Sequence, residues 1–235
     1  LAQQNRSPYF RWAAADDLVT QTLMTDCLDA LDDDPTASLA FTRTALIDEV
    51  GRVMAEQVDD ADRASAPAPV DRFGDIVENE SWCMPVFGVI RSEALARTRL
   101  LLPFYGADRV LLAELALAGH FRRVEGPEFL RRCHDGQSTV MSVDEKVRWT
   151  TGVVRRVSVP APVKATVAFS SALWRADLSS QDRYRALSIV ARHATHRLDR
   201  IIRPGPYNYL GWRGRNPVHP YAHLDMTSTD AGREG

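Results

Sequence analysis

The chain has 235 residues, of which 45% are hydrophobic and 26% charged, and its formal net charge is −2. These values are ordinary for a globular protein and leave no excess of positive charge to attract nucleic acid or an anionic membrane. The three cysteines form no C-x-x-C pair, which argues against a disulfide framework or a structural zinc site and favours a reducing compartment. No apolar run reaches the roughly 18 residues of a transmembrane helix, and the polar start does not resemble a signal peptide.

Short apolar segments alternate with amphipathic ones over the first part of the chain. Residues 9–15 are aromatic and apolar and meet Asp16 and Asp17, which is typical of a buried strand with carboxylates at its C-terminal end. Residues 18–31 carry apolar side chains at helical spacing. The further expected strands are residues 37–47, residues 84–90 and two short strands within residues 121–133. The further expected helices are residues 72–79, 92–97, 109–118 and part of 139–149.

Several connections carry local signals. Residues 48–51 predict a turn, Ser92 is expected to cap the helix that it begins, and Gly119 is expected to end the helix before it. Residues 57–70 are acidic and then rich in alanine and proline, which predicts a mobile loop.

The last part of the chain predicts helices only. Residues 163–175 and 179–200 are amphipathic, and Ser179 followed by Asp182 is typical of a helix N-terminus. Strands and helices in alternation, followed by helices alone, predict an α/β domain with a C-terminal helical extension.

Three stretches carry a resemblance to a known family. They are SPYFRWAAADDL at residues 7–18, PVFGVIRSEAL followed by GADRVLLAEL within residues 85–115, and FLRRCH at residues 129–134 followed by Gln137 and Ser138. In order and spacing they resemble the acidic metal-binding motif, the acceptor-side strand, loop and helix, and the late Arg-x-His strand of family 2 glycosyltransferases. The resemblance covers roughly residues 1–149.

The resemblance implies a partial GT-A fold, which is Rossmann-like with a mostly parallel sheet flanked by helices. Residues 1–150 would be its acceptor and metal side, residues 151–212 a helical extension and residues 213–235 a flexible tail. Nothing before Tyr9 matches the family's first, nucleotide-binding strands. We therefore expect this sequence to lack that part of the domain.

Sugar transfer from a nucleotide donor needs a cation to neutralise the leaving diphosphate. By the resemblance, Asp17 is the main metal ligand, with Asp16 and His134 beside it, and hard oxygen ligands suit Mg²⁺ or Mn²⁺. The alternative is a purely structural role, in which Asp16 and Asp17 only cap the following helix and His134 is a surface or core residue.

The transfer also needs a base that accepts the proton of the acceptor hydroxyl. By the resemblance this is Asp108, which follows Gly106 at the start of a helix, where the helix dipole would keep it ionised. A simple capping role suits Asp108 equally well. Arg109 is either a phosphate contact or a solvated surface side chain.

Other side chains are candidates for substrate contacts. Arg132 and His134 alternate onto one face of a strand, where they could contact the diphosphate. Trp82 is a candidate for stacking on a sugar ring, whereas Trp12 is expected in the core. Glu114 is expected to be a structural partner of an arginine.

Two functions remain open from the sequence. The first is an inverting glycosyltransferase that moves a sugar from a nucleotide-sugar donor to a polysaccharide or glycolipid acceptor, in the cytoplasm or at the inner face of the cell membrane. The second is a non-catalytic remnant or interaction module, which the missing nucleotide-binding part supports. Nucleic-acid binding is disfavoured because the arginines are spread along the chain. The enzymatic hypothesis requires the carboxylates of Asp17 and Asp108 to open into a common cleft.

Overall fold

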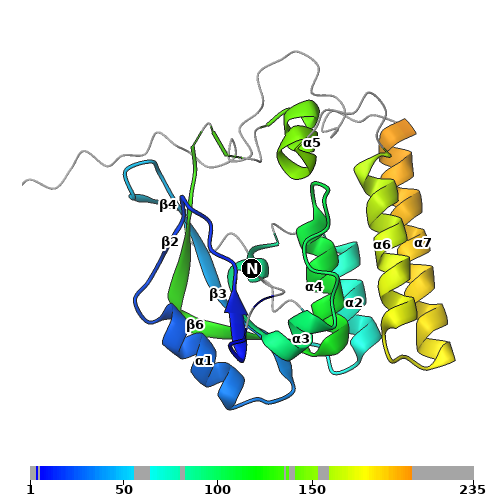
Figure 1. The fold of residues 1–235 in the computed structure, drawn as a ribbon, viewed down its shortest axis with the longest axis horizontal. Helices are drawn as coiled ribbons and strands as arrows, with labels where there is room; N and C mark the ends of the chain where they lie inside the picture. Colours follow the sequence, from blue (N-terminus) through cyan, green and yellow to red (C-terminus); the bar gives the residue numbers. More distant parts are fainter. Residues whose placement is uncertain are drawn as a thin grey trace, which may run out of the picture.

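The computed structural model describes residue 4 and residues 6–55, 64–79, 83–134, 136–137, 141–152 and 159–202. These residues form an α/β fold with one sheet on one side and a group of helices on the other (Figure 1). The strands are β1 (Tyr9–Arg11), β2 (Leu18–Val19), β3 (Ala37–Ile47), β4 (Val53–Ala55), β5 (Val89–Arg91) and β6 (His120–Arg132). The α-helices are α1 (Leu23–Asp32), α2 (Pro69–Glu78), α3 (Ser92–Ala96), α4 (Ala107–Ala118), α5 (Val143–Thr151), α6 (Ala161–Arg175) and α7 (Ser180–Ile202).

The sheet is mixed, which corrects the expectation of a mostly parallel one. Its order is β1-β5-β3-β6-β2, with β4 paired to β3. β3 and β6 run parallel through the centre, and the other pairings among the described strands are antiparallel. The predicted turn at residues 48–51 gives one reason. The amide of Gly51 donates to the carbonyl of Asp48 at 3.1 Å, and so short a connection can join β3 and β4 only as an antiparallel pair.

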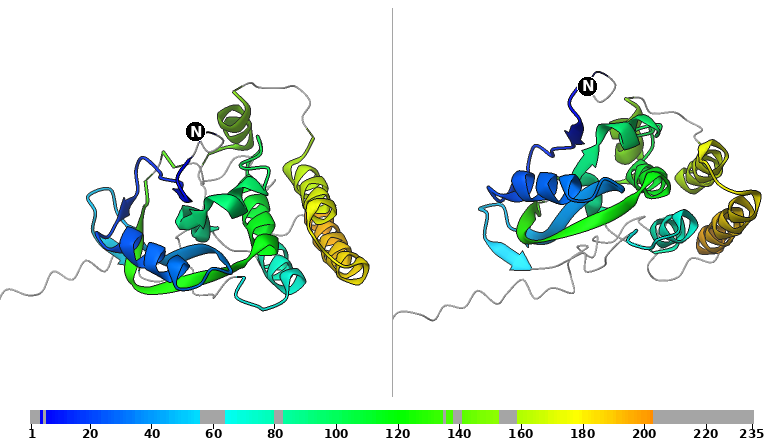
Figure 2. Two further views of the ribbon diagram at one scale, coloured as in Figure 1. Left: turned by 60° about the horizontal axis from the view of Figure 1, so that its bottom comes forward. Right: turned by 90° about the horizontal axis from the view of Figure 1, so that it is seen from below.

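Alternation along β3 divides the core into two layers. Leu39 and Phe41 pack with α2, α4, α6 and α7, whereas Ala40 packs with α1 on the other face. Seen from below, α1 covers one face of the sheet and the remaining long helices stack against the other (Figure 2). The strand pattern alone therefore decides which helices lie on which side.

The first two predicted elements have different bounds in the structure. The strand predicted for residues 9–15 ends at Arg11. The helix predicted for residues 18–31 begins only at Leu23, because Leu18 and Val19 pair with Leu130 and Phe129 of β6. The buried helical stripe also begins at Leu23, so the two residues of β2 were wrongly joined to it.

The segment predicted as a strand at residues 84–90 is first a 3-10 helix, Met84–Phe87, and then the strand β5. Pro85 explains the difference, because a proline has no amide hydrogen to donate within a sheet. The cap predicted at Ser92 is also wrong. Helix α3 has Arg91 at its N-cap, and the amide of Ser92 donates to the carbonyl of Pro8 at 2.9 Å.

The two short strands predicted within residues 121–133 form one continuous strand, β6, with an irregularity in the middle. Thr42 of β3 pairs with Val124, but the next residue, Arg43, pairs with Glu128. Gly126 has a φ of +97° within this bulge, a conformation that favours glycine. The Gly-Pro pair therefore shifts the register of the strand without ending it.

The helical extension shares a core with the rest of the described chain. Phe169 and Leu173 of α6 and Ile189 and Val190 of α7 are buried in the same cluster as α2 and α4. The predicted cap of α7 is confirmed, since the amide of Asp182 donates to Oγ of Ser179 at 3.0 Å.

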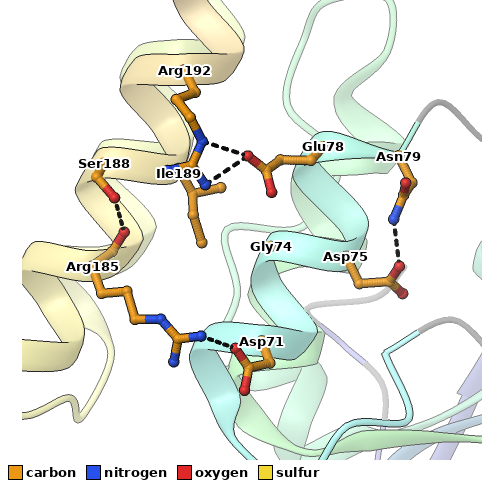
Figure 3. A pocket seen from close by; sticks show the side chains of 9 residues that line it. All are labelled: Asp71, Gly74, Asp75, Glu78, Asn79, Arg185, Ser188, Ile189 and Arg192. Atoms are coloured by element: carbon orange, nitrogen blue, oxygen red, sulfur yellow. Dashed lines mark hydrogen bonds and ion pairs between the residues drawn. The ribbon is translucent and has the colours of Figure 1, made fainter.

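Two ion pairs fix α7 to α2 along a shallow pocket (Figure 3). Arg185 reaches Asp71 at 2.5 Å, and Arg192 reaches Glu78 at 2.8 Å. None of the predicted site residues lines this pocket. Within the described part of the chain, no helix is long and apolar enough to cross a membrane.

Some predictions fall outside the described residues. Residues 57–63, which are half of the predicted mobile loop, belong to this group, as do Trp82 and residues 203–235 with the predicted tail. The last two residues of the predicted loop, 69 and 70, begin α2.

Candidate functional site

Asp17 is held against the end of β6. It follows β1 at the edge of the sheet, and its Oδ1 accepts the backbone N–H of Arg132 at 2.9 Å. Burial raises the pKa of this half-buried carboxyl, and the hydrogen bond opposes that rise. Asp17 directly precedes β2, so this contact joins the start of β2 to the end of β6, its partner strand in the sheet.

Asp16 and His134 contact each other directly. Nε2 of His134 lies 2.8 Å from Oδ2 of Asp16, and this hydrogen bond is the main reason why the pKa of Asp16 is lowered. Nδ1 of His134 accepts the amide of Gly136 at 3.2 Å. Nε2 is therefore the ring nitrogen that carries a hydrogen atom, and it donates a hydrogen bond to Asp16.

Arg132 holds two loops together. Its Nε donates to the carbonyl of Asp16 at 2.9 Å, and its Nη1 donates to the carbonyls of Asp48 and Glu49 at 2.9 and 2.7 Å. These contacts give the guanidinium a structural role at the site. The prediction that Arg132 contacts substrate gains no support from them.

Asp108 lies in the first turn of α4, after Gly106 with its φ of +88°. Its Oδ1 accepts the amide of Arg109 at 2.8 Å. Burial raises the pKa of Asp108 more than the neighbouring amides and arginines lower it, so burial sets the direction of the shift. A carboxyl with a raised pKa is a better proton acceptor once it is ionised.

Arg109 points toward α2, where its Nη1 donates to the carbonyl of Asn79 at 3.0 Å. The adjacent Tyr105 faces α5, since Nζ of Lys146 lies 4.5 Å from the centre of its ring. Burial lowers the pKa of Lys146. Helix α5 therefore docks beside the start of α4, next to Asp108.

Arg131 was missed by sequence reasoning, which selected its neighbour. The pKa of Asp17 and that of Asp108 are raised by burial, and the positive charge of Arg131 is one of the smaller causes that oppose the rise. The same charge adds a little to the lowering of the pKa of Asp16, for which the hydrogen bond with His134 is the main cause. Asp17 and Asp108 are both half-buried, so neither is sealed in the apolar core.

Trp12 and Gln137 carry buried polar atoms that have no hydrogen-bond partner in the described part of the chain. Among the described residues, nothing forms a hydrogen bond with the indole nitrogen of Trp12 or with either amide atom of Gln137. Gln137 is 6% exposed, and its backbone amide donates to the carbonyl of His134 at 3.3 Å. Unpaired buried polar atoms are costly, and only the position of Gln137 just after the Arg-x-His unit pointed to it in the sequence.

The side chains of the candidate site can be compared with the ligands that a divalent cation needs. Within the described residues, no three His, Cys, Asp or Glu side chains gather as a complete metal cage. A magnesium-type ion, however, is commonly held by one or two carboxylates together with phosphate oxygens of a substrate. Asp16 and Asp17 supply such carboxylates, so their chemistry fits this kind of ion. His134 already contacts Asp16, and binding a cation would have to replace that contact.

Comparison of the chain with protein-family models and with curated proteins finds no match. The fold and the site therefore define the class only as an α/β protein with a mixed sheet, in which two carboxylates, a histidine and an arginine meet where β2 begins and β6 ends.

Proposed function

We propose that this chain is the acceptor and metal side of a GT-A glycosyltransferase, which transfers a sugar with inversion from a nucleotide-sugar donor to a carbohydrate or lipid-linked acceptor. The observation that carries the proposal is the pair of contacts that gather the two acidic side chains at the end of β6: the amide of Arg132 donates to Oδ1 of Asp17, and Nε2 of His134 lies 2.8 Å from Oδ2 of Asp16. Two carboxylates with different tasks are what this chemistry requires.

Asp16 and Asp17 would hold Mg²⁺ or Mn²⁺, whose charge stabilises the leaving diphosphate. Asp108 would accept the proton of the acceptor hydroxyl as the acceptor oxygen forms its bond to the anomeric carbon. The bond from that carbon to the diphosphate breaks, and its electron pair leaves with the diphosphate. The raised pKa of Asp108 favours this proton transfer.

His134 would orient Asp16 rather than bind the ion first, because its Nε2–H already donates to that carboxylate. Such a hydrogen bond fixes which oxygen of Asp16 remains available to a cation. Arg132 would keep the two carboxylate-bearing loops in place through its contacts with backbone carbonyls.

Titration of the chain with Mn²⁺, followed by calorimetry or by electron paramagnetic resonance, tests the proposal. We expect Asp17→Asn to weaken Mn²⁺ binding by roughly tenfold or more, since a charged ligand is replaced by a neutral one. Asp71→Asn, on the far helix α2, is the matched control and should bind Mn²⁺ like the unaltered chain. Absence of Mn²⁺ binding, or equal binding by Asp17→Asn, would contradict the proposal and favour the non-catalytic interaction module.

A second measurement addresses the donor. Nucleoside diphosphate sugars with different bases and sugars would be added with and without Mn²⁺, and release of the nucleoside diphosphate would be followed. We expect any release to require the metal and to be lost in Asp108→Asn.

A further inference from the structure

Helix α6 carries a row of outward-facing side chains that contains no charge. The members of this row, which we call the α6 row, lie on one face of the helix at i, i+4, i+7 and i+11: Val163, Val167, Ser170 and Trp174. The two valines and the tryptophan are 48%, 64% and 67% exposed. Ser170 adds little polarity, because its hydroxyl donates to the carbonyl of Thr166 at 3.0 Å.

The opposite face of α6 is apolar as well. Its residues are buried in the core shared with α2 and α4: Ala168, Phe169, Ala172 and Leu173. A surface helix usually has charged and polar residues opposite its buried stripe, and α7 follows that rule with the exposed Arg185 and Arg192. A helix that is apolar on two faces is typical of one that is covered on both. We therefore expect the α6 row to have an occupant.

The end of α7 lies beside the start of this row (Figure 1). The two helices pack as an antiparallel pair, and the rings of Phe169 on α6 and His193 on α7 lie 5.7 Å apart. From that level α6 extends eight residues back to Ala161, and α7 extends nine residues on to Ile202. At 1.5 Å per residue these lengths are about 12 and 14 Å. Helix α7 therefore ends level with the beginning of α6.

The sequence after Ile202 has the composition and the length to cover the row. The two prolines of residues 203–206 disfavour a longer helix, and residues 207–212 are Tyr-Asn-Tyr-Leu-Gly-Trp, without a charge. The row from Val163 to Trp174 is about 17 Å long. Six extended residues reach at most about 20 Å, and the four before them at most about 13 Å. The latter is enough to cross the distance of about 8–10 Å between two packed helices.

The charges at the far end of the row agree with this placement. Arg213 and Arg215 follow the uncharged segment in the sequence. The exposed Asp177 comes shortly after Trp174, just beyond the end of α6. Charges of opposite sign would thus meet where the apolar part of the segment ends, which fixes the direction in which it would lie.

We propose that residues 207–212 of the same chain dock along the α6 row. The aromatic and leucine side chains of this segment would cover Val163, Val167 and Trp174 and remove their apolar surface from water. The inference concerns the helical side of the molecule and does not depend on the proposed function. It makes this face of α6 an internal contact of the chain rather than a surface for a separate protein or for lipid.

Pairs of introduced cysteines test the proposal in the full chain. The native cysteines are buried, so mild oxidation acts on the introduced pair. Val167→Cys would be combined in turn with Tyr207→Cys, Tyr209→Cys and Leu210→Cys, because a disulfide needs Cα atoms within about 7 Å of each other. We expect at least one of these pairs to form a disulfide within one chain about tenfold or more faster than the corresponding control pair.

The control pairs combine Val50→Cys with the same three partners. Val50 is 74% exposed and lies between β3 and β4, on the sheet side of the molecule (Figure 1). Labelling by a maleimide gives a second measurement. Val167→Cys alone should react about fivefold or more slowly than Val50→Cys, because the docked segment shields it. Adding Tyr209→Ser and Leu210→Ser should remove this protection.

The other outcomes overturn the proposal. Equal disulfide rates in the two sets of pairs, or equal maleimide rates for Val167→Cys and Val50→Cys, would show that the α6 row is open to solvent. Disulfide-linked dimers without an intramolecular product would assign the row to a second copy of the chain. Protection that appears only with anionic phosphatidylglycerol vesicles would assign it to a lipid surface. Protection that persists after the serine substitutions would show that residues 207–212 are not what covers the row.

Discussion

The backbone amide of Arg132 donates to Oδ1 of Asp17 at 2.9 Å, and this contact joins residues that are 115 positions apart in the chain. One carboxylate oxygen thereby contributes to the structure, because it fixes the start of β2 to the end of β6. The same side chain is the leading metal candidate. Its structural and functional contributions can be separated by two substitutions.

Asp17→Ala removes the acceptor of the Arg132 amide and should lower the free energy of unfolding by about 1–3 kcal/mol, the usual cost of an unpaired, half-buried donor. Asp17→Asn keeps an acceptor oxygen and should cost less than half as much. Denaturant unfolding measures both values. Equal destabilisation by the two variants would show that the charge of Asp17, rather than this hydrogen bond, supports the fold.

Glu114 is a second carboxylate for which the sequence predicted a structural role, and that prediction is confirmed. Its side chain is 4% exposed, and its Oε1 lies 3.0 Å from Nε of Arg99 and 3.1 Å from Nη1 of Arg175. Its Oε2 also accepts the amide of Arg99. Glu114 thus connects α4 to the end of α6.

We expect Glu114→Ala to destabilise the protein by about 3 kcal/mol, because it leaves two guanidinium groups and a backbone amide without their shared partner. The matched control is Glu78→Ala, which breaks the exposed pair with Arg192 (Figure 3) and should cost less than about 1 kcal/mol. Denaturant unfolding compares them. Similar costs for the two variants would contradict a special role for the buried carboxylate.

The sequence predicted well wherever a local pattern was sufficient. The bounds of β3 match the prediction because its apolar run is buried on both faces, and Ser179 caps α7 because the cap depends only on residues nearby in the chain. Prediction failed where a distant partner decides the outcome. Leu18 and Val19 form a strand only because β6 lies beside them, and the contacts of Arg132 with the carbonyls of Asp16 and Asp48 could be seen only once these distant loops were placed.

Asp34 should make stability depend on pH. Its Oδ1 accepts a hydrogen bond from Oγ1 of Thr36 at 2.7 Å, and its Oδ2 lies 2.8 Å from Nε2 of His120. These contacts lower the pKa of Asp34, with the bond from Thr36 as the largest cause. Because the pKa of Asp34 is lower in the folded protein, its charge stabilises the fold fully when the pH is above the pKa of an unfolded aspartate, about 3.9. This stabilisation is lost as the pH falls through the pKa of Asp34 in the folded protein.

Asp34→Asn should therefore unfold at a lower temperature than the unaltered chain near pH 6, and the difference should shrink as the pH is lowered below about 4. Thr36→Val removes the largest cause of the shift and should show part of the same trend. Thermal unfolding followed by circular dichroism across this pH range measures both effects. A difference that stays constant with pH would show that the ionisation of Asp34 is not linked to folding.

Gly88 lies where the 3-10 helix and β5 pass close to β3. A Cβ atom on this residue would stand 2.3 Å from the carbonyl oxygen of Ala40 and 3.0 Å from Cβ of Phe41. Neither atom can move without shifting the central strand of the sheet. We expect Gly88→Ala to destabilise the protein by about 3 kcal/mol or more, at the upper end of the range for overpacked cores.

Gly51 provides the contrast, because a Cβ atom there would meet nothing within 4 Å, although its φ is +90°. Gly51→Ala should cost about 1 kcal/mol, which is the cost of the left-handed conformation alone. Denaturant unfolding of the two variants distinguishes steric contact from backbone conformation. If Gly88→Ala were as stable as Gly51→Ala, β5 could separate from β3 at little cost.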